Sequence, residues 1–333
     1  MHTGETIKVM VLMPFEEEGK RRLEAAGGGK CEFQYGFDED FLQNTEVLIG
    51  GTPADAYRLT PLTKLRWVQL SWAGTEPYSL PGVLPAGTVL TNATGAFGHA
   101  IGEHMVACVT MLQKKLHLYR DNMAVPCWLD RGNVKSIEGS VVLTLGLGDI
   151  GCNFARRMKG LGAYNIGVRR VGTDKPDYVD ELYLSDRIDE LLPRADVVAM
   201  TLPNTRETYR ILSRERIFSM KKGAILINVG RGNAVDPDAL CEALNSGHLD
   251  GASLDVTDPE PLPADHPLWR CENALITPHI SGFYHLRATY DNIIGICIDN
   301  LSRYVEGRPL CNVVDFETGY RSPSSPQSHA AVN

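Results

Sequence analysis

The sequence lacks the features of a membrane protein and of a nucleic-acid-binding protein. No run of about 20 apolar residues could span a bilayer, and the first residues show neither an apolar leader nor a cleavage site. The formal net charge of −8 argues against binding to nucleic acid or to anionic membranes. We therefore expect a soluble protein in a reducing, cytoplasmic setting.

Paired cysteines and internal repeats are also absent from the sequence. The eight cysteines are scattered and none belongs to a CxxC pair, so we expect neither a metal site nor a dense disulfide framework. What remains is an ordinary globular composition, with 43% hydrophobic and 22% charged residues. A chain of 333 residues is long enough for about two domains.

Short apolar runs alternate with helical patterns from one end of the chain to the other. The runs are nearly continuous in apolar residues, as parallel strands covered on both faces are. They are IKVMVLM, TEVLIGG, LRWVQLS, GTVLTNA, SVVLTLG, YNIGVRR, DVVAMTL, AILINVG, GASLDV and ALITPHI. Helices fit between them, and one has Asp236 as a cap, Pro237 in its first turn and Gly247 at its exit. The pattern is that of a doubly wound α/β protein.

Two long helical stretches, at about 97–118 and 284–306, flank the second set of strands. We therefore predict two doubly wound parallel-sheet (Rossmann-like) domains with a cleft between them, the first discontinuous in sequence. Residues 1–104 and 290–320 would form a flavodoxin-like substrate-binding domain, and 105–289 a dinucleotide-binding domain. The segment 321–333 is rich in serine and proline and predicts a disordered tail.

A glycine-rich turn, GLGDIG, follows one apolar run and precedes a helical pattern. In this strand–turn–helix context the G-x-G-x-x-G spacing is typical of dinucleotide binding. Gly146 permits the turn, Gly148 lets the backbone approach a pyrophosphate, and Gly151 lets the helix lie close to the sheet. The helix N-terminus offers free N–H groups to the anion. We expect the cofactor here, with Asp149 and Ile150 beside it.

The next apolar run ends in Arg169 and Arg170, where such folds usually carry an acid that binds the ribose hydroxyls. An arginine cannot accept those hydrogen bonds, but it can pair with a 2′-phosphate. The sequence therefore predicts a preference for NADP (NADPH), with NAD possible. The alternative is that both arginines are solvated around an NAD site, with Asp174 close enough to supply the acid.

Three later segments end apolar runs with charged residues: ILINVGRGNAVD, GASLDVTDPEPLP and ALITPHISG. Together with GLGDIG, LLPRADVVAMTLPNTRET and MKKGAILINVGRGNAVD they resemble the D-isomer-specific 2-hydroxyacid dehydrogenases. The resemblance is to the glyoxylate/hydroxypyruvate reductase and phosphoglycerate dehydrogenase-like branch. It covers roughly residues 5–316, with weaker matches at SWAGTE, TNATG and GEHM. The chain departs from the pattern at Arg169, where many members have Asp.

The resemblance implies a catalytic set of Arg231, Glu260 and His279, and the chemistry of these residue types agrees. NAD(P)H would supply a hydride to a 2-oxo acid, and His279 would supply the proton. Glu260 would orient His279 and favour its protonated form. Arg231 would pair with the substrate carboxylate and polarise the carbonyl.

Other positions match the family with less force. Asp255 resembles the residue that holds the nicotinamide carboxamide. The backbone of Ala73 and Gly74 would bind the substrate carboxylate, unless SWAGTE is a plain turn. Trp72, Phe283 and Tyr284 would shape the pocket or pack between domains. The remaining expected cofactor residues are Thr201, Leu202, Pro203, Val229, Gly230 and Gly282, with Arg231 and His279 touching both cofactor and substrate.

The expected function is reduction of a small 2-oxo acid, of the glyoxylate or hydroxypyruvate type, to its D-2-hydroxy acid. Two alternatives stay open: an NAD-dependent dehydrogenase of a larger 2-hydroxy acid, and a nucleotide-sensing regulatory protein on the same fold. Trp128 lies in the segment that family members use for subunit contact, unless it is an ordinary core aromatic. The resemblance thus implies a homodimer.

Overall fold

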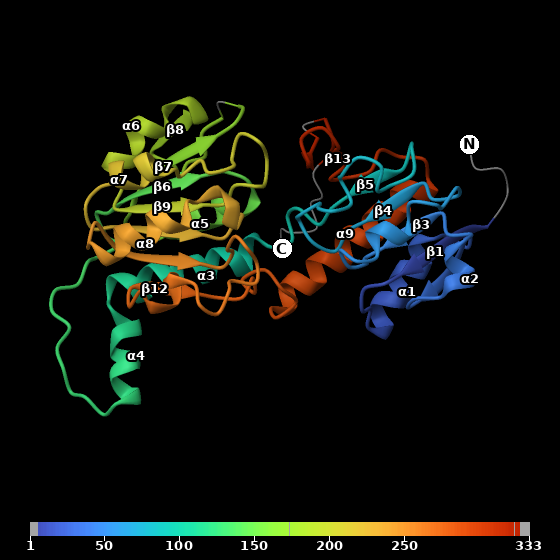
Figure 1. Ribbon diagram of the computed structural model, residues 1–333. Coiled ribbons are helices and arrows are strands. Elements are labelled where there is room, and N and C mark those ends of the chain that lie inside the picture. The colour runs from blue at the N-terminus through green and yellow to red at the C-terminus, as the bar shows by residue number, and fades with distance from the viewer. Residues whose placement is uncertain (1–5, 173, 323, 327–333) are drawn as a thin grey trace. The chain divides into compact units, whose positions relative to one another are not determined.

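The computed structural model describes residues 6–172, 174–322 and 324–326. It divides into two compact units, which we call unit 1 (Met1–Phe97 with Tyr284–Asn333) and unit 2 (Gly98–Phe283). The boundaries expected from the sequence lie a few residues further along the chain, and the roles assigned to the two units stay predictions. Each unit has a parallel sheet covered by helices, which confirms the doubly wound α/β class (Figure 1).

The sheet of unit 1 has the strand order β2-β1-β3-β4-β5, and all neighbouring strands are parallel. This is the order of flavodoxin-like sheets. The strands are β1 (Ile7–Val11), β2 (Cys31–Tyr35), β3 (Val47–Ile49), β4 (Trp67–Gln69) and β5 (Val89–Thr91). The helices are α1 (Glu17–Ala26), α2 (Glu39–Leu42) and α9 (Arg287–Val305), and α1 packs on α9.

The C-terminal part of unit 1 corrects one expectation. Arg321, the first residue of the predicted disordered tail, takes part in an antiparallel pair, β13 (Val314–Asp315) with β14 (Tyr320–Arg321). Ser325 is buried, and its Oγ accepts a hydrogen bond from the backbone N–H of Val313 at 2.9 Å. The described part of this segment is therefore held against unit 1 by backbone hydrogen bonds, while residues 327–333 lie outside the described residues.

The sheet of unit 2 has the parallel strand order β12-β11-β10-β9-β6-β7-β8. The chain runs from β6 to β7 on one side and later returns to β9 on the other side of β6. Ligands bind at the carboxyl ends of the strands at such a reversal. The strands are β6 (Val141–Leu145), β7 (Tyr164–Arg169), β8 (Glu181–Leu184), β9 (Val197–Met200), β10 (Ala224–Asn228), β11 (Leu249–Leu254) and β12 (Ala274–Ile276).

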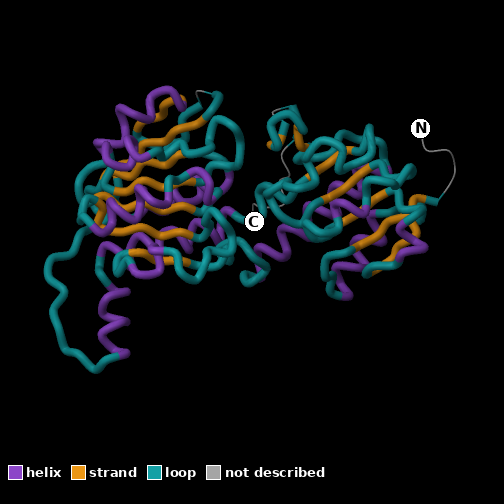
Figure 2. The backbone as a smooth tube through the Cα atoms, viewed as in Figure 1, coloured by secondary structure: helices purple, strands orange, loops and turns teal. Residues whose placement is uncertain are grey.

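The helices of unit 2 include one break that the sequence pattern did not predict. The expected helix over 97–118 is wrong as a single element, because Lys115 takes a left-handed φ of 56° and separates two helices. The second of them and a long loop extend away from the sheet (Figures 1 and 2). The helices are α3 (Gly98–Gln113), α4 (Leu116–Ala124), α5 (Asp149–Gly160), α6 (Ile188–Leu191), α7 (Arg214–Ser219) and α8 (Pro237–Asn245).

Local signals for α8 are confirmed. The Asp236 carboxylate accepts hydrogen bonds from the backbone N–H groups of Asp238 and Ala239, both at 3.1 Å, and Gly247 takes a φ of 68° after the helix. Short 3-10 helices complete the fold at Ala56–Arg58, Ser185–Arg187, Leu192–Arg194, Gly232–Ala234 and Pro267–Arg270.

Each unit has its own apolar core beneath its sheet. Leu48, Val68 and Leu90 on β3, β4 and β5 of unit 1 are fully buried, and so are Leu143, Val198 and Leu226 on β6, β9 and β10 of unit 2. Among the described residues, every helix falls short of the length and apolar character that crossing a lipid bilayer requires. The cores fix the strands, and the loops at their carboxyl ends are left to carry chemistry.

Candidate active site

The glycine turn lies at the strand reversal of unit 2, between β6 and α5. Gly146 has a φ of 100°, and a Cβ on Gly151 would lie 2.0 Å from the carbonyl oxygen of Gly146. A Cβ on Gly148 would meet no atom of the described residues within 4 Å. The turn therefore has glycine where the backbone is crowded and open space in front of the helix N-terminus, which fits a nucleotide phosphate.

The two arginines at the end of β7 have different environments. Arg169 is half-buried; its Nη1 donates to the backbone oxygen of Asp174 at 3.1 Å, and its buried Nε has no partner among the described residues. The carboxyl pKa of Glu207 lies below its usual value because its own backbone N–H and Thr205 donate to it, with Arg170 and Arg206 adding attraction. Arg169 thus places a half-buried guanidinium at the end of β7, and its positive charge suits an anionic ligand.

Two loops from neighbouring strands close on the glycine turn. The hydroxyl of Thr201 donates to the carbonyl oxygen of Gly146 at 2.6 Å, which joins the loop after β9 to the turn. A Cβ on Gly230 would lie 2.3 Å from the oxygen of Leu202, and the N–H of Val229 donates to Met200 at 3.1 Å. The expected cofactor residues in 201–203 and 229–231 therefore lie along one edge of the sheet.

A buried amide supports the turn that carries Arg231. The Nδ2 of Asn228, which is 1% exposed, donates to the backbone oxygen of Arg231 at 2.9 Å, and its Oδ1 accepts from the N–H of Gly230 at 3.0 Å. A Cβ on Gly232 would lie 2.0 Å from the oxygen of Thr257, so glycine allows this turn to touch the loop after β11. Asn228 is not among the site residues expected from the sequence, although a polar residue at the end of the apolar run AILIN was a usable signal.

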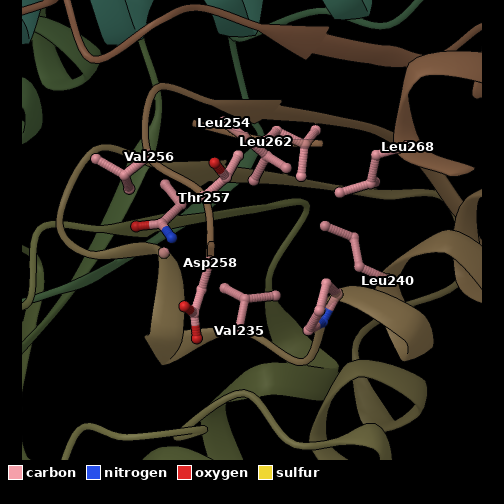
Figure 3. A pocket seen from close by; sticks show the side chains of 11 residues that line it. Val235, Leu240, Leu254, Val256, Thr257, Asp258, Leu262 and Leu268 are labelled. Carbon is pink, nitrogen blue, oxygen red and sulfur yellow. The ribbon is translucent and has the colours of Figure 1, made fainter. Parts of the chain in front are cut away.

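Beneath this turn lies a small pocket with a mostly apolar wall. Figure 3 shows Val235, Leu240, Leu254 and Leu268 around it, beside the loop that carries Thr257 and Asp258. The aliphatic lining offers little to a charged substrate. We therefore regard this pocket as part of the packing behind the Arg231 turn. The polar candidate residues lie instead on the loops that follow the strands.

His279 and Glu260 form a direct pair in unit 2. The Nδ1 of His279 lies 2.6 Å from Oε1 of Glu260, and the two side chains are 49% and 42% exposed. An ionised carboxylate can only accept hydrogen bonds, so Nδ1 carries the shared hydrogen. The other ring nitrogen, Nε2, is then the atom available for proton exchange with a ligand.

Asp255 holds the segment that carries His279. Its carboxylate, in a residue 1% exposed, accepts from Thr277 Oγ1 at 2.5 Å, from the N–H groups of Ile280 and Ser281 at 3.0 and 3.1 Å, and from Ser281 Oγ. Burial acts to raise the pKa of the Asp255 carboxyl, but these hydrogen bonds outweigh burial and leave it below its usual value.

The backbone of His279 is fixed as well. Its φ of 52° is left-handed, which is uncommon for a residue with a side chain, and its N–H donates to the backbone carbonyl oxygen of Asp255 at 2.9 Å. Thr277 and Ser281 are not among the site residues expected from the sequence, whereas Asp255 is expected to hold the nicotinamide. The hydroxyls on either side of His279 in ITPHISG were the available signal, and the nicotinamide role of Asp255 stays a prediction.

The remaining expected residues lie apart from this cluster in the chain. Trp72, Ala73 and Gly74 follow β4 in unit 1, where Trp72 packs against the core and Tyr284 donates to Ser71 Oγ at 2.9 Å. Phe283, the last residue of unit 2, is 56% exposed. Trp128 is fully exposed on the loop after α4, so the alternative of a core aromatic is wrong.

Comparison with known proteins identifies the family. The sequence model of the D-isomer specific 2-hydroxyacid dehydrogenase NAD binding domain matches residues 106–281, more than half of the chain. The chain belongs to the D-isomer specific 2-hydroxyacid dehydrogenase family. The resemblance inferred from the motifs is thereby confirmed, and the protein is an oxidoreductase of this type that uses a nicotinamide cofactor.

Individual family members agree over nearly the whole chain. Glyoxylate/hydroxypyruvate reductase B of Pectobacterium carotovorum is 30% identical over 289 residues, which are 84% of this chain and 88% of the relative. A family member from Aeromonas salmonicida is 32% identical, with a TM-score of 0.83 over 94% of this chain and all of that one. A 2-hydroxyacid dehydrogenase from Xanthobacter autotrophicus, solved with NADPH and MES, is 25% identical with a TM-score of 0.80, over 95% and 100% of the two chains.

Proposed function

We propose that this dehydrogenase reduces a small 2-oxo acid, of the glyoxylate or hydroxypyruvate type, to the D-2-hydroxy acid with NADPH. The observation that carries the proposal is the 2.6 Å pair of His279 and Glu260. It lies in the same unit as the glycine turn, on a segment that Asp255 holds. Support for the substrate class comes from the relatives named glyoxylate reductase, from Thermofilum pendens, and glyoxylate/hydroxypyruvate reductase B.

The proposed chemistry assigns one task to each side chain. A bound nicotinamide supplies the hydride that reaches the carbonyl carbon of the substrate. His279 gives the proton on Nε2 to the carbonyl oxygen, which completes the hydroxyl group. Glu260 accepts the hydrogen bond from Nδ1 of His279 and holds the ring in the orientation needed for proton transfer. Arg231 pairs with the substrate carboxylate and stabilises negative charge that develops on the carbonyl oxygen.

In unit 1 we propose that the backbone N–H groups of Ala73 and Gly74 bind the substrate carboxylate, with Trp72 beside them. Neither N–H has a partner among the described residues, and both residues are half-buried. Backbone N–H groups in a turn are suitable donors to an anion.

The proposed NADPH preference rests on the end of β7. Arg169 and Arg170 place positive charge where the usual ribose-binding acid would repel a phosphate, and Arg169 Nε is unpaired. The bound NADPH in the Xanthobacter autotrophicus relative is consistent with this preference.

We propose a homodimer formed through α4 and the loop after it. Met123, Val125 and Trp128 on this excursion are 75%, 69% and fully exposed, and apolar side chains that gather on one projecting segment mark an association surface. Sedimentation of the wild type and of Trp128→Glu tests this, because the charged side chain should shift a dimer to monomer. A wild-type monomer would contradict it.

The catalytic proposal is tested by initial rates on a panel of 2-oxo acids with NADPH and with NADH. We expect turnover of glyoxylate or hydroxypyruvate, with NADPH the better cofactor, and the D-configured product. Binding of NADPH without turnover of any 2-oxo acid would overturn the proposal.

A further inference from the structure

A buried asparagine in unit 1 holds the loop that we assign to the substrate carboxylate. Asn92 follows β5 and is 2% exposed. Its Nδ2 donates to the backbone oxygen of Ala73 at 2.8 Å, and its Oδ1 accepts from the N–H of Thr94 at 3.2 Å. The next residue, Ala93, donates its N–H to the oxygen of Trp72 at 3.0 Å. Two successive carbonyl groups of the loop are therefore held by one segment.

The direction of the loop's N–H groups follows from these two bonds. In a trans peptide the C=O and the following N–H point to opposite sides of the chain. Because the oxygens of Trp72 and Ala73 both turn toward Asn92 and Ala93, the N–H groups of Ala73 and Gly74 turn away from them. Successive N–H groups on one side of a turn make a concave site for an anion.

Asn92 is itself fixed from a third segment. Asn312 is fully buried with a left-handed φ of 55°. Its Nδ2 donates to the backbone oxygens of Asn92 at 3.3 Å and Thr94 at 2.8 Å. The backbone N–H of Asn92 donates in turn to the backbone oxygen of Asn312 at 3.3 Å. These bonds fix the backbone of Asn92, which limits how far its side-chain amide can move from Ala73.

We propose that Asn92 is a positioning residue, which aims the N–H groups of Ala73 and Gly74 at the substrate carboxylate. The proposal rests on the carboxylate-binding role assigned to this loop above. A purely structural amide would stabilise unit 1 without affecting substrate binding, so the two roles differ in the Michaelis constant of the oxo acid.

The test compares two substitutions of Asn92 with a matched control. Asn92→Asp removes the donor to Ala73 and retains an acceptor for Thr94, and Asn92→Ala removes both without adding a charge. The control is Asn300→Asp, because Asn300 is also fully buried in unit 1 but donates to Gln69 Oε1 at 2.8 Å and to Cys311 at 3.0 Å. All variants are compared by circular dichroism and thermal unfolding before assay.

We expect both Asn92 variants to raise the Michaelis constant of glyoxylate about tenfold, equivalent to about 1.4 kcal/mol, as for one lost hydrogen bond. The turnover number and the dissociation constant of NADPH should change much less, and Asn300→Asp should leave the Michaelis constant near the wild-type value. An unchanged Michaelis constant in folded Asn92 variants, or an equal rise in the control, overturns the proposal.

A second measurement does not depend on turnover. Hydrogen exchange at the Ala93 amide reports its bond to Trp72, and we expect it to be about tenfold faster in Asn92→Ala but unchanged in Asn300→Asp. A wild type that reduces no 2-oxo acid overturns the proposed function, while Ala93 exchange still tests whether Asn92 holds the loop. If the exchange rate of the Ala93 amide is unchanged in Asn92→Ala, Asn92 does not hold the loop, and this conclusion does not depend on whether the enzyme is active.

Discussion

Units 1 and 2 are both parallel α/β sheets, but their candidate chemistry differs in kind. In unit 2 the expected groups are charged side chains on loops at strand ends, such as Arg231, Glu260 and His279. In unit 1 they are backbone N–H groups of a short loop after β4. Charged side chains leave a motif that can be read along the chain, whereas a backbone donor can belong to any residue. The candidate groups of unit 2 can therefore be identified from the sequence more readily than those of unit 1.

The two units also share a device. Asn228 holds the turn of Arg231 by its carbonyl oxygen at 2.9 Å, and Asn92 holds Ala73 in the same way at 2.8 Å. An amide can donate to one backbone group and accept from another at once. In each unit a buried asparagine at or next to the end of a strand thus fixes a loop that we assign to ligand binding.

The largest expected effect tests the assignment of proton transfer to unit 2. His279→Ala should lower the turnover number for glyoxylate reduction by about 10²–10⁴-fold, the usual contribution of a positioned acid. The measurement is steady-state kinetics with saturating NADPH. His248→Ala serves as control, because His248 packs against Phe218 rather than a strand-end loop. A His279→Ala enzyme with near-normal turnover would remove the main difference between the units.

Arg231→Ala should lower kcat/KM for a 2-oxo acid by about 10²–10³-fold, because a carboxylate partner and a charge stabiliser are lost together. Thermal unfolding should change little by comparison. The matched variant is Arg214→Ala, whose guanidinium pairs with Glu242 on exposed helices. If the control loses as much activity as Arg231→Ala, the loss reflects general damage and the assignment to Arg231 fails.

Arg169→Asp should weaken NADPH by about 10–100-fold while NADH is unharmed or improved, since attraction to the 2′-phosphate is replaced by repulsion. Arg170→Ala should show a smaller loss. Michaelis constants for both cofactors in wild type and variants provide the measurement. Equal use of NADH and NADPH by the wild type would leave both arginines as solvated charges.

Glu260→Gln should lower the turnover number for glyoxylate reduction, but by less than His279→Ala does. The charged acceptor that lies 2.6 Å from Nδ1 and orients the ring becomes a neutral amide, while the ring itself remains. The measurement is steady-state kinetics with saturating NADPH. Unchanged turnover in Glu260→Gln would argue against the pairing of Glu260 with His279.

The smallest effect concerns a charge in unit 2 that we assign to stability alone. Glu181 on β8 accepts hydrogen bonds from Arg194 and Tyr183, which lower the pKa of its carboxyl to about 2. A lowered pKa stabilises the fold above the usual value of 4.5, and this stabilisation is lost as pH falls toward 2.

Between pH 4.5 and pH 2 the free energy of unfolding of Glu181→Gln should therefore fall less than that of the wild type. We expect the difference to be roughly 1 kcal/mol after allowance for solvent screening. Chemical denaturation at several pH values measures it. Glu190→Gln is the control and should show a smaller change, because solvent screens the exposed pair that Glu190 forms with Arg187. A change in turnover in Glu181→Gln would show that the residue does more than stabilise the fold.

Particular elements show where sequence reasoning succeeds. Runs such as AILINVG and SVVLTLG identified central strands correctly, because strands buried on both faces are continuously apolar. β2 and β8 were missed because their residues are half-exposed or exposed, and strands such as CEFQY mix polar and apolar residues. The break at Lys115 was also missed, since its left-handed backbone has no strong signal in the local sequence.

By itself, the sequence determined the α/β class, the glycine turn at the strand reversal and the charged residues past β7, β10, β11 and β12. It could do so because the continuous apolar runs of buried strands and the glycine spacing of the turn are local features of the sequence. Only the tertiary structure decided which groups hold the His279 segment and Ala73, namely Asp255 and Asn92. The bonds of Asp255 and Asn92 join residues about 20 positions apart in sequence, and packing of neighbouring strands, rather than any local pattern, brings such partners together.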